Sequence, residues 1–415
     1  TLFPYTTLFR STVYYFNIIA SLSIYFILYF TAPLIADFYN QPQLVLLIKV
    51  ICLSFVIDAL GRIHIVHLEK NLDFKSQSII GGISVLIAGI ISITMAYTGY
   101  GVWALVAHTV IKSIITTILF WWVSKWRPLL AFSKKSLKSL FMFGSKILVA
   151  GLMQSIFQNI YFLIIGRVFS AQSLGYFTRA TQFKDLPIIT LTSMIQKVTF
   201  PVFSEIQDDD EKLISGYTKA IRMLSLIVLP LMGIIIIASE PLIDIVLGDK
   251  WLPVVPYLNL MAAYGWMYII YVMNHQIITV KGRSDYYLHI KIIDKILIIL
   301  SILVTYKYGI MAMIYGNLVV TILTYYIGNI YLNKVIDLKL IYQIKHIFPF
   351  FLSASLLVIT GITLSRFIVN DFLYLLVSVP LGILVYISFL HLLHVEEIKI
   401  GFNVIKKTLS NFYKT

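Results

Sequence analysis

The sequence predicts an all-α membrane protein that crosses the bilayer many times. Of its 415 residues, 59% are hydrophobic and only 13% are charged, whereas soluble domains carry about 25% charge. Apolar stretches long enough to span a bilayer core, which takes about 20 helical residues, alternate with short basic loops. Two parts of the chain also resemble each other at a constant spacing, which is typical of duplicated transporter bundles.

Apolar segments of bilayer-spanning length predict twelve helices. They cover residues 14–36, 43–67, 78–97, 101–123, 139–166, 172–204, 214–238, 253–280, 286–305, 309–332, 346–367 and 371–394. The segment 172–204 is too long for one straight crossing, and we expect Pro187 and Pro201 to bend or end it, because proline removes a helical hydrogen bond.

The basic residues orient these helices. Most lie in alternate connections, namely residues 68–77, 124–138, 205–213, 281–285, 333–345 and the tail after 394. The opposite connections hold only Arg167, Lys250, Lys307 and Arg366. Because cytoplasmic loops are enriched in Lys and Arg, the first set and the C-terminus are predicted to be cytoplasmic. The net charge of +14 therefore needs no nucleic-acid partner.

Two segments return after 208 residues. Residues 33–35 (Pro-Leu-Ile) recur at 241–243, and the Tyr-Gly dipeptide that opens 100–106 recurs at 308–314. The first four predicted helices then correspond to the helices from 214–238 to 309–332. The two helices within 139–204 have no partner in the first copy, since their equivalents would precede residue 1.

This repeat predicts the domain organisation. We expect two six-helix lobes and a final helix pair, with about twelve of fourteen helices present and two missing from the amino end. Residues 1–11 lack the pattern of the rest and are interpreted as an artefact. The predicted parts are 12–138 for the rest of the N-terminal lobe, 139–340 for the C-terminal lobe, 341–395 for the helix pair and 396–415 for a cytoplasmic tail.

Several short motifs occur in order along the chain. They lie at residues 101–106, 143–146, 159–161, 165–167, 174–180, 200–203, 207–211, 248–253 and 280–285. The ordered set resembles the Wzx-type polysaccharide flippases, and within them the colanic-acid and lipopolysaccharide exporters, of the multidrug/oligosaccharidyl-lipid/polysaccharide exporter superfamily. The resemblance covers about residues 12–395.

The resemblance implies a non-enzymatic transporter with two lobes around a central cavity and alternating access. Its cargo would be an undecaprenyl-pyrophosphate-linked oligosaccharide, moved across the bacterial inner membrane for O-antigen or exopolysaccharide synthesis. The implied partners are this lipid-linked oligosaccharide, membrane lipids, and a polysaccharide polymerase with its assembly proteins. No nucleic acid and no bound cofactor are expected.

Polar side chains at membrane depth are the candidate cargo-binding groups, because they are costly there unless they face a cavity or a partner. Arg and Lys bind phosphate, and Gln can hydrogen-bond sugar hydroxyls. The candidates for a cationic cavity are Lys112, Lys146, Arg179, Lys184, Gln154 and Gln158. Asp185 and Asp294 are candidates for coupling transport to H+ or Na+.

Structural roles remain open for these residues. The lysines could snorkel to an interface, the glutamines could join helices, and Arg179 could belong to an interfacial turn. Lys184 could pair with Asp185, and Lys291 with Asp294, because each pair is close in sequence.

Other functions are less consistent with the sequence. An organic-cation antiporter of the same superfamily would favour acidic groups at depth, whereas the deep charges here are mainly basic. A membrane glycosyltransferase or polymerase should carry a long extramembrane segment, yet the longest internal loop has about 15 residues. The pairs His64/His67 and His391/His394 have no third metal ligand nearby. The single Cys52 argues against a Cys-based metal site.

Overall fold

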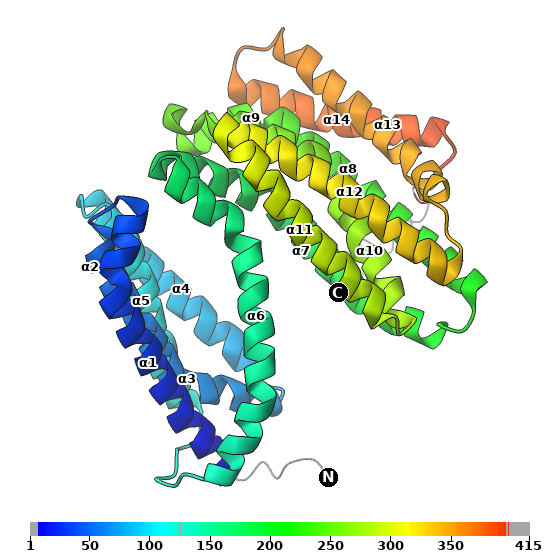
Figure 1. Cartoon of the computed structure of the whole chain (residues 1–415). Coiled ribbons are helices and arrows are strands. Elements are labelled where there is room, and N and C mark those ends of the chain that lie inside the picture. The colour runs from blue at the N-terminus through cyan, green and yellow to red at the C-terminus, as the bar shows by residue number, and fades with distance from the viewer. Residues whose placement is uncertain (1–6, 125, 396, 398–415) are drawn as a thin grey trace, which may run out of the picture. The chain divides into compact units, whose positions relative to one another are not determined.

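The computed structural model describes residues 7–124, 126–395 and 397, and all regular elements among them are helical. The helices are α1 (Thr7–Tyr39), α2 (Leu44–Ile51), α3 (Leu53–Lys70), α4 (Phe74–Tyr97), α5 (Val102–Val123), α6 (Lys134–Val168), α7 (Ala171–Glu205), α8 (Asp210–Leu247), α9 (Val254–Gly265), α10 (Met267–Val280), α11 (Ser284–Thr305), α12 (Ile310–Ile336), α13 (Leu340–Ser365) and α14 (Asp371–Leu392), shown in Figure 1. The predicted all-α class is confirmed.

Each predicted span corresponds to one helix or to a helix pair with a single break. Nine helical segments of the described chain, α2–α3 taken as one, are long and apolar enough to cross a membrane. The span 253–280 is split at Trp266 into α9 and α10. The long α7 runs through Pro187 and Pro201 and ends at Glu205, so neither proline ends it.

The chain forms two units, Thr1–Gln158 (unit 1) and Asn159–Thr415 (unit 2). Their boundary falls inside α6, which runs without interruption from Lys134 to Val168. The lobe boundary expected between residues 138 and 139 stays a prediction.

In unit 1, α5 packs between α3 and α4. The hydroxyl of Thr117 on α5 donates a hydrogen bond to the Ile57 carbonyl on α3 (2.9 Å), and the indole of Trp121 donates to the Leu60 carbonyl (2.9 Å). Gly61 permits this approach, because a Cβ there would lie 2.9 Å from the Thr117 hydroxyl. These polar contacts fix the register of α3 against α5.

The start of α1 contacts the α5–α6 connection. The Ser11 hydroxyl accepts a hydrogen bond from the Leu129 amide (2.8 Å), and that of Thr12 accepts one from the Ser133 amide (3.0 Å). Residues 7–11 of the segment interpreted as an artefact are therefore helical, and Ser11 anchors the start of α1. Residues 1–6 lie outside the described residues. The interpretation itself stays a prediction.

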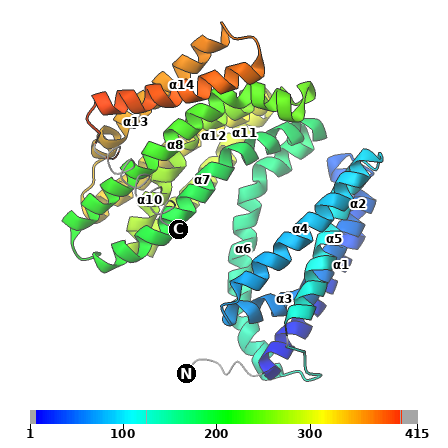
Figure 2. The same cartoon turned by 180° about the vertical axis from the view of Figure 1, so that it is seen from behind.

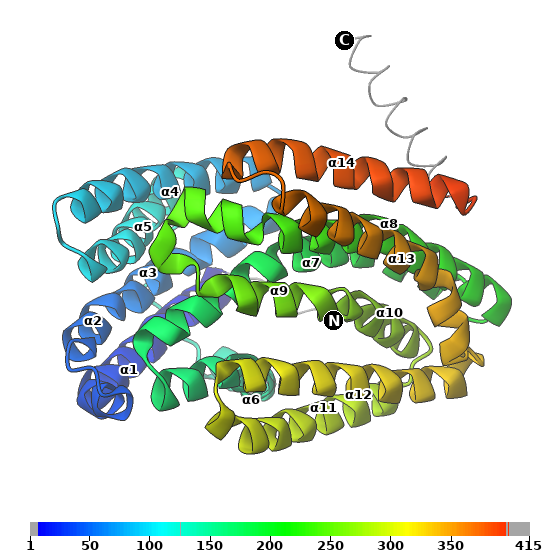
Figure 3. The ribbon, with the colours of Figure 1, turned by 90° about the horizontal axis from the view of Figure 1, so that it is seen from above.

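In unit 2, α7, α9, α10, α13 and α14 pack against α8. Its buried residues recur every three or four positions, as in Leu213, Tyr217, Ile221, Leu224 and Val228, which is the pattern of a helix buried along one face. The pair α13–α14 packs along α8 (Figure 2). Seen from above, α10 lies between α7 and α12 (Figure 3).

A buried hydrogen-bond network joins four helices of unit 2. The Tyr217 hydroxyl of α8 donates to the Asn274 side-chain oxygen of α10 (2.5 Å). The Tyr325 hydroxyl of α12 donates to the Gln343 side-chain oxygen of α13 (3.0 Å). Because the alternative is an unsatisfied polar group inside the bundle, this network favours one packing of the helices.

The helix ends repeat at the predicted offset. α1 and α8 end at Tyr39 and Leu247, and α5 and α12 begin at Val102 and Ile310, in both cases 208 residues apart. The span after α1 and the span after α8 are each broken once, into α2–α3 and α9–α10. Gly101 and Gly309 both take positive φ values, 52° and 97°. The structure of the two copies thus agrees with duplication.

Candidate functional site

A cavity of about 430 Å³ lies within unit 2 between α7, α10 and α11. We call it the α10 pocket. Its lining residues are Gln196 and Phe200 of α7, Tyr268, Tyr271, Val272, His275, Gln276 and Thr279 of α10, and Ser284, Tyr287 and Lys291 of α11. Aromatic, amide and hydroxyl groups surround a single lysine in this lining.

The break at Trp266 and the glycine before it place α10 against α7. A Cβ on Gly265 would lie 2.9 Å from the Ile188 side chain and 3.3 Å from that of Lys184, so only glycine fits without movement. From there, Tyr268, Tyr271 and His275 recur at helical spacing and share one face of α10. The sequence of α10 therefore directs an aromatic face into the pocket.

The aromatic side chains form a continuous row. The ring centroids of Tyr268 and Tyr271 are 6.1 Å apart, those of Tyr271 and His275 are 4.0 Å apart, and those of His275 and Tyr287 are 5.3 Å apart. Nδ1 of His275 lies 2.7 Å from the Tyr271 carbonyl, so Nδ1 carries the proton in this contact. Nε2 of His275 is buried and has no hydrogen-bond partner among the described residues.

Lys291 places a positive charge at the end of this row. Its ammonium donates a hydrogen bond to the Tyr271 hydroxyl (2.7 Å) and lies 5.0 and 5.4 Å from the ring centroids of Tyr271 and Tyr287. Within the described ranges it forms no ion pair. Asp294 pairs instead with Lys295 (3.0 Å) and accepts a hydrogen bond from the Thr324 hydroxyl (3.2 Å). The suggested Lys291–Asp294 pair is therefore not formed.

Three of the predicted residues lie together on α7. Lys184 and Asp185 form an ion pair of 2.7 Å, and Lys184 packs beside Gly265. Arg179 is exposed, donates to the Gln182 side-chain oxygen (3.0 Å) and lies over the Trp251 ring at 5.8 Å. None of the three lines the α10 pocket.

The other predicted residues belong to unit 1. Lys112 on α5 and Gln154 and Gln158 on α6 are exposed, and the side chain of Lys146 lies outside the described part of the structure. Among the predicted residues whose side chains are described, Lys184 and Asp185 are the two in direct contact. The cationic cavity made of all six residues stays a prediction.

Sequence reasoning overlooked the aromatic face of α10. A signal was present, because Tyr268, Tyr271 and His275 recur at helical spacing within one span and precede a helix that contains Lys291. The sequence indicates Lys291 as a possible partner of Asp294, but not its place beside this aromatic face.

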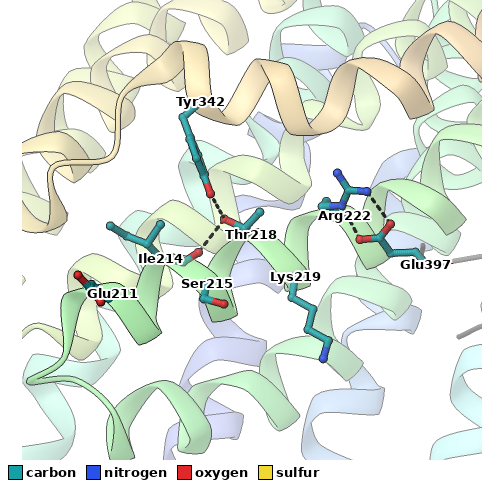
Figure 4. A pocket seen from close by; sticks show the side chains of 8 residues that line it. All are labelled: Glu211, Ile214, Ser215, Thr218, Lys219, Arg222, Tyr342 and Glu397. Carbon is teal, nitrogen blue, oxygen red and sulfur yellow. Dashed lines mark hydrogen bonds and ion pairs between the residues drawn. The ribbon is translucent and has the colours of Figure 1, made fainter. Parts of the chain in front are cut away.

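A second cavity, of about 570 Å³, lies beside the first half of α8 (Figure 4). Arg222 donates hydrogen bonds to both carboxylate oxygens of Glu397, with 2.6 Å for its Nη2. Burial raises the pKa of the Glu397 carboxyl, but hydrogen bonds from Arg222 and its charge outweigh this and hold the pKa below its usual value. The Tyr342 hydroxyl on α13 contacts that of Thr218 at 3.4 Å. This cavity, which we call the α8 pocket, carries charges of both signs.

Comparison with known proteins places the chain in a family. Residues 5–256, more than half of the chain, match the family described as polysaccharide biosynthesis protein. The chain is 29% identical over 388 residues to the teichuronic acid biosynthesis protein TuaB of Bacillus subtilis (strain 168), which covers 92% of this chain and 80% of TuaB. It is 25% identical over 363 residues to the lipopolysaccharide biosynthesis protein WzxC of Escherichia coli (strain K12), covering 84% and 72%.

Two further similarities agree with this result. The succinoglycan biosynthesis transport protein ExoT of Rhizobium meliloti (strain 1021) is 21% identical over 251 residues, covering 60% of this chain and 51% of ExoT. The fold matches that of the lipid II flippase MurJ in an inward closed conformation, with a TM-score of 0.73 at 20% identity, over 94% of this chain and 85% of MurJ. The resemblance drawn from the motifs is confirmed, and the protein is a multi-pass membrane protein that belongs to the polysaccharide biosynthesis protein family.

Proposed function

We propose that this protein moves a lipid-linked oligosaccharide across the bacterial inner membrane during surface polysaccharide synthesis. Family membership and the relatives named for polysaccharide synthesis and transport support this function. The observation that carries it is the α10 pocket, in which one lysine and three tyrosines meet within unit 2. Such a lining suits a polar, anionic head group.

The cargo would divide between two environments. The sugar and phosphate groups would occupy the polar pocket, because charged groups are costly in hydrocarbon, while the lipid tail stays in the bilayer. The basic loops place the residue 281–285 connection at the cytoplasm, so the α10 pocket lies toward that side and the C-terminus is cytoplasmic. Alternating access would then release the head group on the other side.

The remaining residue roles belong to this proposal. Lys112, Lys146, Arg179, Lys184, Gln154 and Gln158 would contact the cargo along its path. Asp185 and Asp294 would couple the cycle to H+ or Na+. A polysaccharide polymerase and its assembly proteins would receive the cargo, and the protein itself would perform no covalent chemistry.

Reconstitution tests this function directly. The full chain would be placed in liposomes that carry a fluorescent lipid-linked oligosaccharide in both leaflets, and a membrane-impermeant quencher would be added outside. With active protein, nearly all label becomes quenchable over time, whereas empty liposomes protect about half. Liposomes with Lys291→Met should lose most of the rate, and those with Lys307→Met, a lysine beside Tyr306 outside the pocket, should keep it. Equal protection with and without the wild-type protein would refute the proposal.

A further inference from the structure

Lys291 has no acidic residue beside it in the described lining of the α10 pocket, and Asp294 acts on its charge only from beyond ion-pair distance. Its ammonium bonds to a neutral hydroxyl, that of Tyr271 (2.7 Å), and the neighbouring carboxylate of Asp294 is already paired with Lys295. A cation removed from bulk water is costly unless an anion accompanies it. A bound anion would complete the pocket by taking the remaining donors of this ammonium.

Aromatic surface adjoins this charge. Tyr268 is 44% exposed and Tyr287 is 39% exposed, and both line the pocket. Aromatic rings offer a flat apolar face with a polar edge, against which the C–H face of a sugar ring can pack. The amide of Gln196 and the hydroxyl of Ser284 line the same space and provide donors and acceptors for ring hydroxyls.

His275 adds an unsatisfied acceptor beneath the rings. Its Nδ1 is held by the Tyr271 carbonyl, and its buried Nε2 lacks a partner among the described residues. An unpaired buried polar atom is unfavourable. The Tyr287 ring, 5.3 Å away between centroids, covers it from α11. A ligand hydroxyl that reaches past the edge of this partly exposed ring would satisfy Nε2.

We propose that the α10 pocket binds a sugar ring that bears an anionic group, with the anion on Lys291 and the ring against Tyr268 and Tyr287. This rests on the proposed function and narrows its cargo. The anion has two possible sources, the carboxylate of an acidic sugar in the repeat unit or the phosphate on the sugar nearest the lipid. A neutral sugar would leave Lys291 without an anion. A bare phosphate would leave Tyr268 and Tyr287 without a sugar ring to contact.

Titration of the purified full chain in lipid nanodiscs tests this inference. The probes are glucose, glucuronate, glucose 1-phosphate and inorganic phosphate, each measured by isothermal calorimetry. At least one of the two anionic sugars should bind about tenfold or more tightly than glucose and than phosphate, as expected for a charge-assisted hydrogen bond added to ring contacts. Preference for glucuronate assigns the acidic sugar as the source, and preference for glucose 1-phosphate assigns the lipid-proximal sugar.

Matched variants separate the contributions. Lys291→Met should reduce the affinity for the anionic sugar to that for glucose, while Lys307→Met leaves it unchanged. His275→Phe should weaken the binding of all three sugars but not that of inorganic phosphate. His346→Phe is its control, because His346 makes the same Nδ1 contact with the carbonyl of a tyrosine four residues earlier (2.8 Å) but is half-buried on α13 and does not line the α10 pocket.

The outcomes also separate this inference from the proposed function. The inference is overturned if the affinity depends neither on the anionic group nor on Lys291, or if no probe binds. This holds even if the protein moves lipid-linked oligosaccharide in liposomes. Lys291-dependent binding in a protein that moves no such lipid refutes the proposed function and leaves the sugar site standing.

Discussion

A tight contact between α8 and α13 in unit 2 predicts a large effect from a single methyl group. At Gly361 of α13, an added Cβ would overlap the γ-methyl of Ile237 on α8 and would lie 2.8 Å from its Cβ. The Ile237 side chain is branched at this point and cannot turn away, so α13 or α8 must move. The Tyr374 hydroxyl of α14 lies 3.1 Å from the Gly361 carbonyl and 3.2 Å from that of Ile237, so movement would also weaken this bridge.

The magnitude follows from these two effects. Overpacking in a well-packed interior costs about 1–3 kcal/mol, and weakening one hydrogen bond adds about 0.5–1.5 kcal/mol. Alanine has the higher helix propensity, which offsets up to about 1 kcal/mol of this destabilisation. We therefore expect Gly361→Ala to lower the free energy of unfolding by about 0.5–4.5 kcal/mol.

Gly328→Ala is the matched control. Gly328 is also a helical residue of unit 2, on α12, but nothing lies within 4 Å of a Cβ added there. It should be neutral or stabilising by up to about 1 kcal/mol. Both variants would be purified in detergent and heated, and the folded fraction would be followed by gel filtration. Equal melting temperatures for the two variants would show that the α8–α13 contact is not as tight as described.

Three further predictions concern other contacts. Tyr217→Phe, which removes the hydroxyl bound to Asn274, should destabilise unit 2 by about 1–2 kcal/mol in the same assay; an unchanged melting temperature would contradict a role for the buried network. Trp121→Phe should destabilise unit 1 by about 0.5–1.5 kcal/mol, since it removes one hydrogen bond and little apolar area, and a shift no larger than the error would exclude this contact. Because the folded-state pKa of Glu397 is lowered, its contact with Arg222 should be complete above the usual carboxyl pKa near 4.5 and lost as the pH falls through the lowered value. The stability advantage of the wild type over Glu397→Gln should then shrink as the pH falls from 7 to 3. An advantage that grows as the pH falls would contradict this reasoning.

Sequence reasoning recovered the helices because hydrophobic length dominates in a membrane protein. The predicted 208-residue repeat agrees with the structure, in which Gly101 and Gly309 precede equivalent helix starts and both have positive φ. Sequence reasoning did not locate the break at Trp266, because Gly265 and Trp266 interrupt neither the hydrophobicity nor the length of the span. A glycine that is needed for close packing and one that is not look the same in a sequence.

The candidate site was predicted less well, for a different reason. Charges at membrane depth were recognised, but their partners depend on helix rotation, which the sequence leaves undefined. Asp294 could face Lys291 or Lys295 by spacing alone, and the packing of Thr324 on α12 against it selects the second. The unpaired state of Lys291 is thus a consequence of a neighbouring helix.

The length of α8 has a consequence for where its charges lie. Its 38 residues measure about 57 Å at about 1.5 Å per residue, whereas the hydrocarbon core is about 30 Å thick. Even a steep tilt of about 40° leaves about 18 Å of this helix outside the hydrocarbon. Asp210 opens the helix, and Arg222 follows about 18 Å along it. The acidic and basic residues of the first turns suit this part outside the hydrocarbon, so we expect the α8 pocket beside them to be accessible to ions and protons from the head-group layer.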